Sequence, residues 1–307
     1  MKSIVYILVL FCLISCVRKT DEIVTQFDPH FKNVIPIVSE DTTTTFIVIG
    51  DWGYEGDGLQ AVSEQMNELA SYIQIDFIAT LGDNFYPEGV LSTTDPNWDI
   101  FTDNFAQDAL QIPWYISIGN HDHLGNEQAQ VDYSAIDDRW TFPYFFYEFK
   151  RSINYSGDSL GVIVIDSQRL RSNPNSLNQL NWIDSVADAS NTPWKIMMGH
   201  HPLYSYGYHG SSELMQGLLE ETLNDNKIDL YLAGHDHDLQ HIKTNGYTEY
   251  FISGSGGKIR DTDTGEYSLF SLSDYGFLTI RLSSKTLTCY FIDKEGTVVY
   301  TYQIVKQ

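Results

Sequence analysis

Cysteine is scarce in this chain. Only three of its 307 residues are cysteines, and two of them, Cys12 and Cys16, lie within the first sixteen residues. We interpret those sixteen residues as a targeting segment, so no cysteine pair is left to form a disulfide within the fold. Cys289 stands in an apolar stretch and is expected to be a buried thiol. The fold must therefore rest on its hydrophobic core, and a content of 42% hydrophobic residues allows a large one.

Basic residues are also few. Lys and Arg total 18 against 41 Asp and Glu, which gives a formal net charge of −23. A surface of this sign repels nucleic acid and anionic membranes at long range. We therefore expect no nucleic-acid partner, and we interpret the acidity chiefly as a solubility trait.

Long apolar runs are missing apart from one at the N-terminus. Lys2 precedes the run Ile4–Ile14, which is too short to span a bilayer comfortably. The run ends in Leu-Ile-Ser-Cys at residues 13–16, which resembles a bacterial lipobox. The alternative is an ordinary secretory signal in which Cys16 is incidental. We expect an exported protein whose only membrane attachment is a lipid on Cys16, on the periplasmic or surface side of a bacterial envelope.

Three parts of the chain follow from this interpretation. We expect residues 1–16 to be the signal segment, residues 17–41 a linker, and residues 42–307 one folded catalytic domain. No further long apolar run occurs, so this domain is expected to be soluble. The sequence does not indicate an oligomeric state.

Runs typical of strands alternate with helical patterns over much of the chain. The patterns predict strands over 45–49, 77–81, 114–118, 161–165, 195–198 and 230–233, and helices over 59–72, 98–110, 176–189 and 214–223. Such alternation is typical of βαβ units. Polar side chains follow the ends of these strands, and open α/β sheets place their sites at that edge.

The last third of the chain differs. Strands are predicted over 247–253, 276–282, 286–292 and 297–304, and the short turns between them indicate antiparallel pairing. We therefore predict an α/β fold of two packed mixed β-sheets flanked by helices, a sandwich built from βαβ units. In this prediction the antiparallel strands form the second sheet, which packs against the first.

Five short clusters carry the chemistry. They are Gly50-Asp51-Trp52-Gly53, Gly82-Asp83-Asn84-Phe85-Tyr86, Gly119-Asn120-His121-Asp122, Gly199-His200 and Gly234-His235-Asp236-His237. Their carboxylate, phenolate, amide and imidazole groups suit two adjacent cations such as iron, zinc or manganese. The glycine before each ligand is expected to let the backbone turn sharply toward the site. A pair of cations of this kind is suited to attack on phosphate esters.

Each cluster taken alone has a structural explanation. Asp51 could cap a helix, Tyr86 could be a core residue with one hydrogen bond, and Asn120 could form a turn. Two histidines separated by one residue, as at 235 and 237, are also found without a metal. The ordered occurrence of all five clusters, each after a predicted strand, favours the metal interpretation.

The same clusters resemble the motifs of the purple acid phosphatases, within the calcineurin-like metallophosphoesterases. The blocks Gly-Asp-Trp-Gly, Gly-Asp-Asn-Phe-Tyr, Gly-Asn-His-Asp, Gly-His-x-Pro and Gly-His-Asp-His all occur, in that order. The stretches at 139–143, 253–256 and 275–280 resemble the small, tartrate-resistant type. The resemblance extends from about Thr45 to Ile304.

The resemblance implies a role for each matching residue. A ferric ion would be bound by Asp51, Tyr86 and His237, and a second, divalent ion (Fe, Zn or Mn) by Asn120, His200 and His235, with Asp83 bridging the two ions. His121 and His209 match the two histidines that face the substrate. His200 is preferred to His201 as the ligand because it directly follows Gly199. Asp122 either orients His121 or caps the backbone.

These residues imply a binuclear acid phosphatase that hydrolyses small phosphomonoesters through a metal-bound hydroxide. The ions bring about five positive charges and Asp51, Asp83 and Tyr86 remove three, so the pocket remains positive in an acidic protein. Protonated His121 and His209 would suit an acidic optimum. The alternatives are a phosphodiesterase or nucleotidase of the same superfamily, and a non-catalytic surface protein whose metals are structural. A redox role for the iron, generating oxygen radicals, is left open as a side activity.

Overall fold

The computed structural model describes residues 29–37, 43–153, 157–173 and 177–306. The expected signal segment, with its lipobox and Cys16, lies outside the described residues. Within the described ranges, no helix is both long and apolar enough to cross a bilayer.

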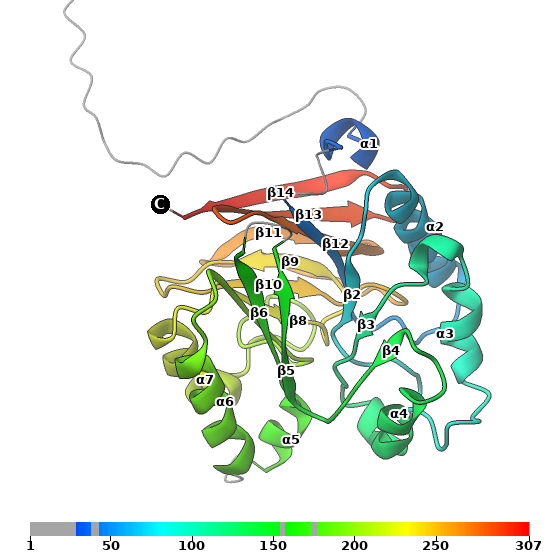
Figure 1. Cartoon of the computed structure of the whole chain (residues 1–307), viewed down its shortest axis with the longest axis horizontal. Helices are drawn as coiled ribbons and strands as arrows, with labels where there is room; N and C mark the ends of the chain where they lie inside the picture. The colour runs from blue at the N-terminus through cyan, green and yellow to red at the C-terminus, as the bar shows by residue number, and fades with distance from the viewer. Residues whose placement is uncertain (1–28, 38–42, 154–156, 174–176, 307) are drawn as a thin grey trace, which may run out of the picture.

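The described part of the chain contains two sheets of seven strands each (Figure 1). The first has the order β14-β13-β12-β1-β2-β3-β4, with β1 Thr44–Ile49, β2 Phe77–Thr80, β3 Trp114–Tyr115, β4 Trp140–Thr141, β12 Gly276–Leu282, β13 Thr286–Asp293 and β14 Val298–Val305. The second has the order β11-β9-β10-β8-β7-β6-β5, with β5 Tyr147–Ser152, β6 Ser159–Val164, β7 Trp194–Met198, β8 Leu230–Ala233, β9 Leu239–Ile242, β10 Glu249–Ser253 and β11 Ser268–Leu272.

Helices cover the two sheets on their outer sides. Figure 1 shows α2 Asp57–Tyr72, α3 Trp98–Asn104 and α4 Glu127–Tyr133 beside the first sheet, and α5 Ser167–Ser172, α6 Leu177–Ala189 and α7 Glu213–Asp225 beside the second. Both sheets contain parallel and antiparallel pairs, for example β1 with β2 and β1 with β12. The prediction of two mixed sheets flanked by helices is confirmed.

The spacing of apolar residues explains why these helices form where they do. Leu59, Val62, Met66 and Leu69 of α2 recur every three or four residues and are fully buried. In α7, the Ser212 hydroxyl accepts a hydrogen bond from the N–H of Met215, which caps the first turn.

The core between the sheets takes side chains from both of them. Phe46 and Leu278 of the first sheet belong to the same buried cluster as Leu160 and Phe251 of the second. Trp52 lies fully buried among aromatic rings of this cluster, with ring centroids 5.4 Å from Phe105 and 5.6 Å from Phe85. It therefore packs in the core.

The division of strands between the sheets differs from the prediction. Strands β12 to β14 do not form a separate sheet, because β12 pairs antiparallel with β1 and so extends the first sheet. Every residue of β1 and β12 is buried, so each strand needs a paired neighbour on both edges and cover on both faces. Strand β10 instead joins the second sheet, where it is parallel to β8 and antiparallel to β9.

Two predicted elements are shorter than expected. The helix predicted over 98–110 ends at Asn104, and a short 3-10 turn, η1 Asp108–Leu110, follows it. Gln107 between them has an extended backbone, which interrupts the helix. The strand predicted over 114–118 pairs only at Trp114 and Tyr115.

Part of the segment predicted to be a linker is folded onto the domain. The turn α1 Phe31–Val34 buries Phe31 completely and is followed by the buried Ile35. These two side chains are four residues apart and so lie on one side of the turn. His30 forms a β-bridge with Thr297, next to β14. The linker interpretation of residues 17–41 is therefore wrong for residues 30–35.

Candidate metal centre

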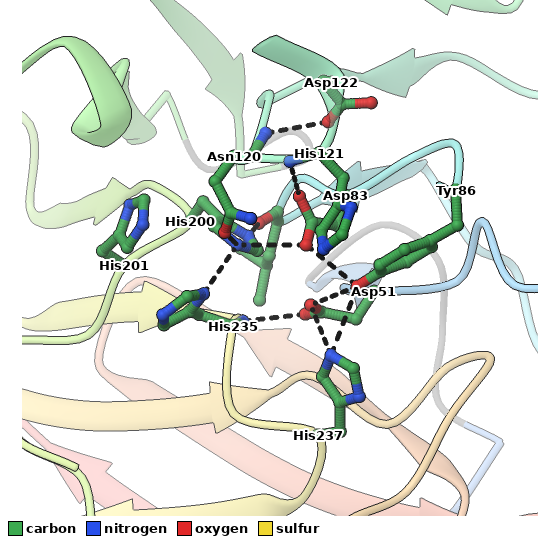
Figure 2. Close-up of polar contacts among 12 residues, drawn as sticks. Asp51, Asp83, Tyr86, Asn120, His121, Asp122, His200, His201, His235 and His237 are labelled. Atoms are coloured by element: carbon green, nitrogen blue, oxygen red, sulfur yellow. Dashed lines mark hydrogen bonds and ion pairs between the residues drawn. The ribbon is translucent and has the colours of Figure 1, made fainter. Parts of the chain in front are cut away.

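The predicted ligands meet at the carboxyl ends of strands from both sheets. Asp51 follows β1 and Asp83 follows β2, both in the first sheet, whereas His200 follows β7 and His235 follows β8 in the second. Figure 2 shows these side chains pointing toward one another. Parallel strands bring their carboxyl ends to one edge of a sheet, which explains why residues far apart in the sequence converge here.

One group of atoms gathers around the hydroxyl of Tyr86. This oxygen lies 3.1 Å from Oδ1 of Asp51, 2.9 Å from Oδ2 of Asp83 and 3.2 Å from Nε2 of His237. The His237 Nε2 atom is also 3.3 Å from Oδ1 of Asp51. The three residues predicted to bind the ferric ion thus lie together, with Asp83 beside them.

A second group gathers around Nε2 of His200. This nitrogen lies 3.1 Å from Oδ1 of Asn120, 3.1 Å from Nδ1 of His235 and 3.4 Å from Oδ2 of Asp83. The same oxygen of Asp83 therefore faces both groups (Figure 2). This is the position that a bridging carboxylate would need. All seven predicted ligands are accordingly brought together.

The hydrogen positions in the second group favour a bound cation. Nδ1 of His200 lies 2.9 Å from the carbonyl oxygen of Leu81, which can only accept, so Nδ1 carries a hydrogen, and in the neutral ring Nε2 presents a lone pair. That lone pair faces the acceptor oxygens of Asn120 and Asp83. Electron-rich atoms at these distances repel one another unless a positive ion lies among them. The residues present therefore fit a bound metal ion.

The buried acidic groups of the first group also favour a bound cation. Burial raises the pKa of Asp51 well above its usual value, and the neighbouring charge of Asp83 adds to this increase. Burial also raises the pKa of the Tyr86 phenol far above its usual value, with Asp51 and Asp83 as further causes. Three anionic groups would thus share one buried space. A bound cation would reverse this preference and favour the ionised, coordinating forms of Asp51 and Tyr86.

The histidines of the centre are held in the form that binds metals. Burial lowers the pKa of His237 to about 4 and lowers that of His235 further. Both imidazoles are consequently neutral over the ordinary pH range. A neutral imidazole offers the lone pair that a metal needs.

Left-handed backbone occurs at the ligands themselves. Asp51, Asp83 and His235 have φ values of 55°, 51° and 70°. Such values are uncommon outside glycine and cluster at functional sites. The prediction that the preceding glycines make the turns holds only for Gly82, whose φ is 88°.

Other glycines of the motifs are needed because they are small. A Cβ atom on Gly119 would lie 2.2 Å from Oδ1 of Asp83, and one on Gly234 would lie 2.3 Å from Oδ2 of Asp51. Real Cβ atoms do not approach other atoms so closely. These glycines therefore allow the backbone to pass directly beside the two carboxylates.

Asp122 caps the backbone and does not orient His121. Its fully buried carboxylate accepts hydrogen bonds from the N–H of Gly119 at 2.8 Å, the N–H of Asn84 at 3.1 Å and the amide of Gln130 at 2.9 Å. Burial raises its pKa to about 7, with Asp83 as a second cause. Of the two interpretations left open above, the capping role is the one observed.

His121 lies beside the first group. Its ring centroid is 4.3 Å from that of Tyr86, and its backbone N–H donates to Oδ1 of Asp83 at 2.8 Å. Its Nδ1 donates to the carbonyl oxygen of Pro87 at 2.6 Å. The ring is therefore fixed, and Nε2 remains available to a ligand.

His209 lies on the other side of the centre, stacked on His235 with ring centroids 4.1 Å apart. Arg260 donates a hydrogen bond to its Nε2 at 2.7 Å. Burial and the charge of Arg260 lower the pKa of His209. Protonation of His209 at acidic pH is therefore disfavoured in the protein without substrate.

Two residues near the centre carry no motif signal. Arg260 belongs to the segment between β10 and β11, and its backbone N–H donates to the carbonyl oxygen of His237 at 2.9 Å. His201, expected to be only a neighbour of His200, offers a ring nitrogen within 4.8 Å of ligand atoms of His200 and His235. Sequence reasoning had no basis for including Arg260, because it does not follow a strand end.

Comparison with known proteins agrees with this geometry. Residues 44–239 match the calcineurin-like phosphoesterase family. The chain therefore belongs to the calcineurin-like phosphoesterases, and the curated proteins it resembles are purple acid phosphatases. The predictions of this family and of a phosphatase enzyme are confirmed.

Individual relatives cover most of the chain. Human tartrate-resistant acid phosphatase type 5 is 28% identical, over 89% of this chain and 95% of its own. Purple acid phosphatase 3 of Arabidopsis thaliana is 33% identical, over 86% of this chain and 78% of its own. Among solved structures, GAP50, named as the anchor in the inner membrane complex of Plasmodium, has a TM-score of 0.79 and 25% identity. It covers 87% of this chain, and the match spans 90% of GAP50.

Proposed function

We propose that the protein is an acid phosphatase that hydrolyses small phosphomonoesters at a centre of one ferric and one divalent ion (Fe, Zn or Mn). The observation that carries the proposal is the sharing of Asp83 Oδ2 between two ligand groups. Asp51, Tyr86 and His237 would hold the ferric ion. Asn120, His200 and His235 would hold the second ion.

When bound, two such ions lower the pKa of a water molecule and neutralise charge on the phosphoryl oxygens. Groups of the protein itself orient the predicted ligands. The Leu81 carbonyl fixes the tautomer of His200, and Asp122 fixes the loop that carries Asn120 and His121 through the N–H of Gly119.

His121 would hold the proton for the leaving alcohol. Its Nδ1 is committed to the Pro87 carbonyl, so the proton would be delivered from Nε2. His209 and Arg260 would contact the phosphate or the leaving group from the opposite side. In this role Arg260 contributes the permanent positive charge, since the pKa of His209 is lowered by burial.

The direct test combines metal analysis with a visible spectrum of the purified protein. We expect two metal ions per chain, one of them iron, and a broad charge-transfer band from Tyr86 to Fe(III). Tyr86→Phe should lose the band, and Asp83→Ala should lose hydrolysis of an aryl phosphate. Wild-type hydrolysis by Asp83→Ala would refute the proposal.

A phosphodiesterase or nucleotidase of the same superfamily is the alternative enzyme. Turnover of a phosphomonoester and a matched phosphodiester distinguishes the two. We expect kcat/KM for the monoester to be higher, and the reverse order would favour the alternative.

A non-catalytic role is the alternative from another class, and the description of GAP50 as an anchor supports keeping it. His121 separates the two functions, because a structural metal centre does not need it. We expect His121→Ala to keep its metals and to lose most activity. Unchanged activity in every assay would favour a binding protein.

We further propose that the protein is exported and carries a lipid on Cys16. The support is the apolar run with its lipobox-like end. Metabolic labelling with a fatty acid should mark the full-length protein, and Cys16→Ser should abolish the label while leaving export intact. Label on the Cys16→Ser variant would contradict the assignment.

A further inference from the structure

A small cavity adjoins the metal centre on the side of His235. Its volume is about 130 Å³, and it is lined by Arg171, His201, Pro202, His209, Gly210, Ser211, Ser212 and His235. No acidic residue lines it, although the whole chain carries a net charge of −23. A cavity of this size has room for a group of a few heavy atoms, such as a carboxylate or a phosphate, because one water molecule takes about 30 Å³.

His201, one of the residues that line this cavity, has a buried hydrogen-bond donor without a partner among the described residues. The hydroxyl oxygen of Ser167 accepts hydrogen bonds from the backbone N–H of His200 at 3.1 Å and of His201 at 2.9 Å. Both of its lone pairs are then occupied, so its hydrogen must go to Nδ1 of His201, 2.9 Å away. Nδ1 is thus the acceptor, and Nε2 carries the hydrogen.

That hydrogen has no acceptor among the residues that the structure describes. His201 is 1% exposed, and its Nε2 has no hydrogen-bond partner there. Leaving a buried donor without a partner costs about 1–3 kcal/mol, so an acceptor from a ligand is the simplest complement.

Positive charge borders part of the same cavity. Arg171 of α5 is exposed, and within the described ranges its guanidinium has no ion pair or hydrogen bond. The N-terminus of α7, a helix of 13 residues capped by Ser212, also borders the cavity. The N-terminus of a helix favours a negative group.

We propose that this cavity is a subsite for a second anionic group, a carboxylate or a phosphate, carried by the alcohol part of the phosphomonoester. Arg171 supplies the charge, and Nε2–H of His201 supplies the directed hydrogen bond. The proposal rests on the proposed function, since it takes the first phosphate to lie at the metal centre. Arg171 and His201 would therefore determine which esters the enzyme prefers.

The test compares phenyl phosphate with its ortho-, meta- and para-carboxy derivatives in the metal-loaded protein. We expect at least one carboxylated ester to have the lower KM in the wild type. Arg171→Gln should reduce the ratio of kcat/KM, carboxylated over unsubstituted, about tenfold, as expected for the loss of one charge-assisted hydrogen bond. The effect should lie in KM. Comparing each variant with the wild type cancels the difference in leaving-group chemistry.

Lys150→Gln is the matched control, because it removes one exposed positive charge from β5, away from the cavity lining. This control should leave the ratio unchanged. An equal decrease in both variants, or no decrease in Arg171→Gln, would overturn the subsite.

Binding of non-hydrolysable benzylphosphonates, with and without a carboxylate, provides a readout independent of turnover. Their dissociation constants by calorimetry should show the same ratio in the wild type and the same decrease in Arg171→Gln. If the wild type binds these ligands with that preference but hydrolyses no ester, the proposed function fails while the subsite stands. If phenyl phosphate is hydrolysed without any carboxylate preference, the subsite fails and the function stands.

His201→Leu removes the donor, and His201→Gln keeps an N–H at a similar position. We expect the carboxylate preference to decrease in the first variant and to be partly restored in the second. A third metal ion in the wild type that is missing from His201→Leu would instead show that the cavity is a cation site, and would overturn the proposal.

Discussion

At the scale of single residues, the centre depends on a glycine whose lack of a side chain leaves room for a predicted ligand. Gly119 passes so close to Asp83 that any side chain would displace the carboxylate, because its Cβ would also lie 2.8 Å from Nδ1 of His200. The carboxylate of Asp83 is the one shared by both ligand groups. A single methyl group at position 119 should therefore disturb both metal positions.

We predict that Gly119→Ala loses metal affinity and activity by at least tenfold and is destabilised by about 1–3 kcal/mol through overpacking. Metal analysis and thermal unfolding measure the two effects. Gly217→Ala in α7 is the control, since a Cβ there meets nothing within 4 Å and should stabilise the helix by about 0.5–1 kcal/mol. Full metal content in Gly119→Ala would contradict the packing argument.

At the scale of elements, a ring of charged side chains joins the loop after β3 to the loop after β6. Nε2 of His123 lies 2.9 Å from Oδ1 of the fully buried Asp166, and its Nδ1 lies 2.6 Å from Oε1 of Glu127. Arg169 closes the ring with contacts to both carboxylates. The loop that carries Asn120 and His121 is thereby tied to the second sheet.

This ring should make stability depend on pH. Burial alone would lower the pKa of His123, but hydrogen bonds to Asp166 and Glu127 outweigh it and raise the pKa to about 9. A raised histidine pKa contributes stability that is fully present below about pH 6.5 and is lost as the pH rises through about 9. We predict that His123→Gln is about 2 kcal/mol less stable at pH 6 and nearly equal to the wild type above pH 9.

Denaturant unfolding of both proteins at pH 6, 7.5 and 9.5 measures this difference. Equal destabilisation at every pH would mean that His123 acts only by packing.

At the scale of the whole molecule, the sequence predicts the convergence of the candidate ligands better than it predicts the architecture. The ligands follow strand ends in short motifs, so local pattern is enough to find Asp51 or His200. The assignment of strands to sheets is set by long-range pairing, such as β12 with β1, which leaves no local signal. Arg171 and His201 were not singled out for the same reason, because their role depends on a cavity formed by α5, α7 and the loop after β7.

The candidate metal centre takes its residues from both halves of the molecule. Asp51, Tyr86 and Asn120 come from loops of the first sheet, whereas His200, His235 and His237 come from loops of the second. An ion bound by both sets stabilises the folded state, because the unfolded chain cannot present these ligands together. An ion at a thousand times its Kd adds about 4 kcal/mol to the free energy of unfolding.

We therefore predict that chelation lowers the Tm by about 10 °C and that readdition of iron and zinc restores it. Calorimetry with parallel metal analysis measures both steps. Asp83→Asn is the control, since weakening the shared ligand should leave little for the chelator to remove. Metal-free wild-type protein with an unchanged Tm would show that the core between the sheets, and not the ions, holds the two halves together.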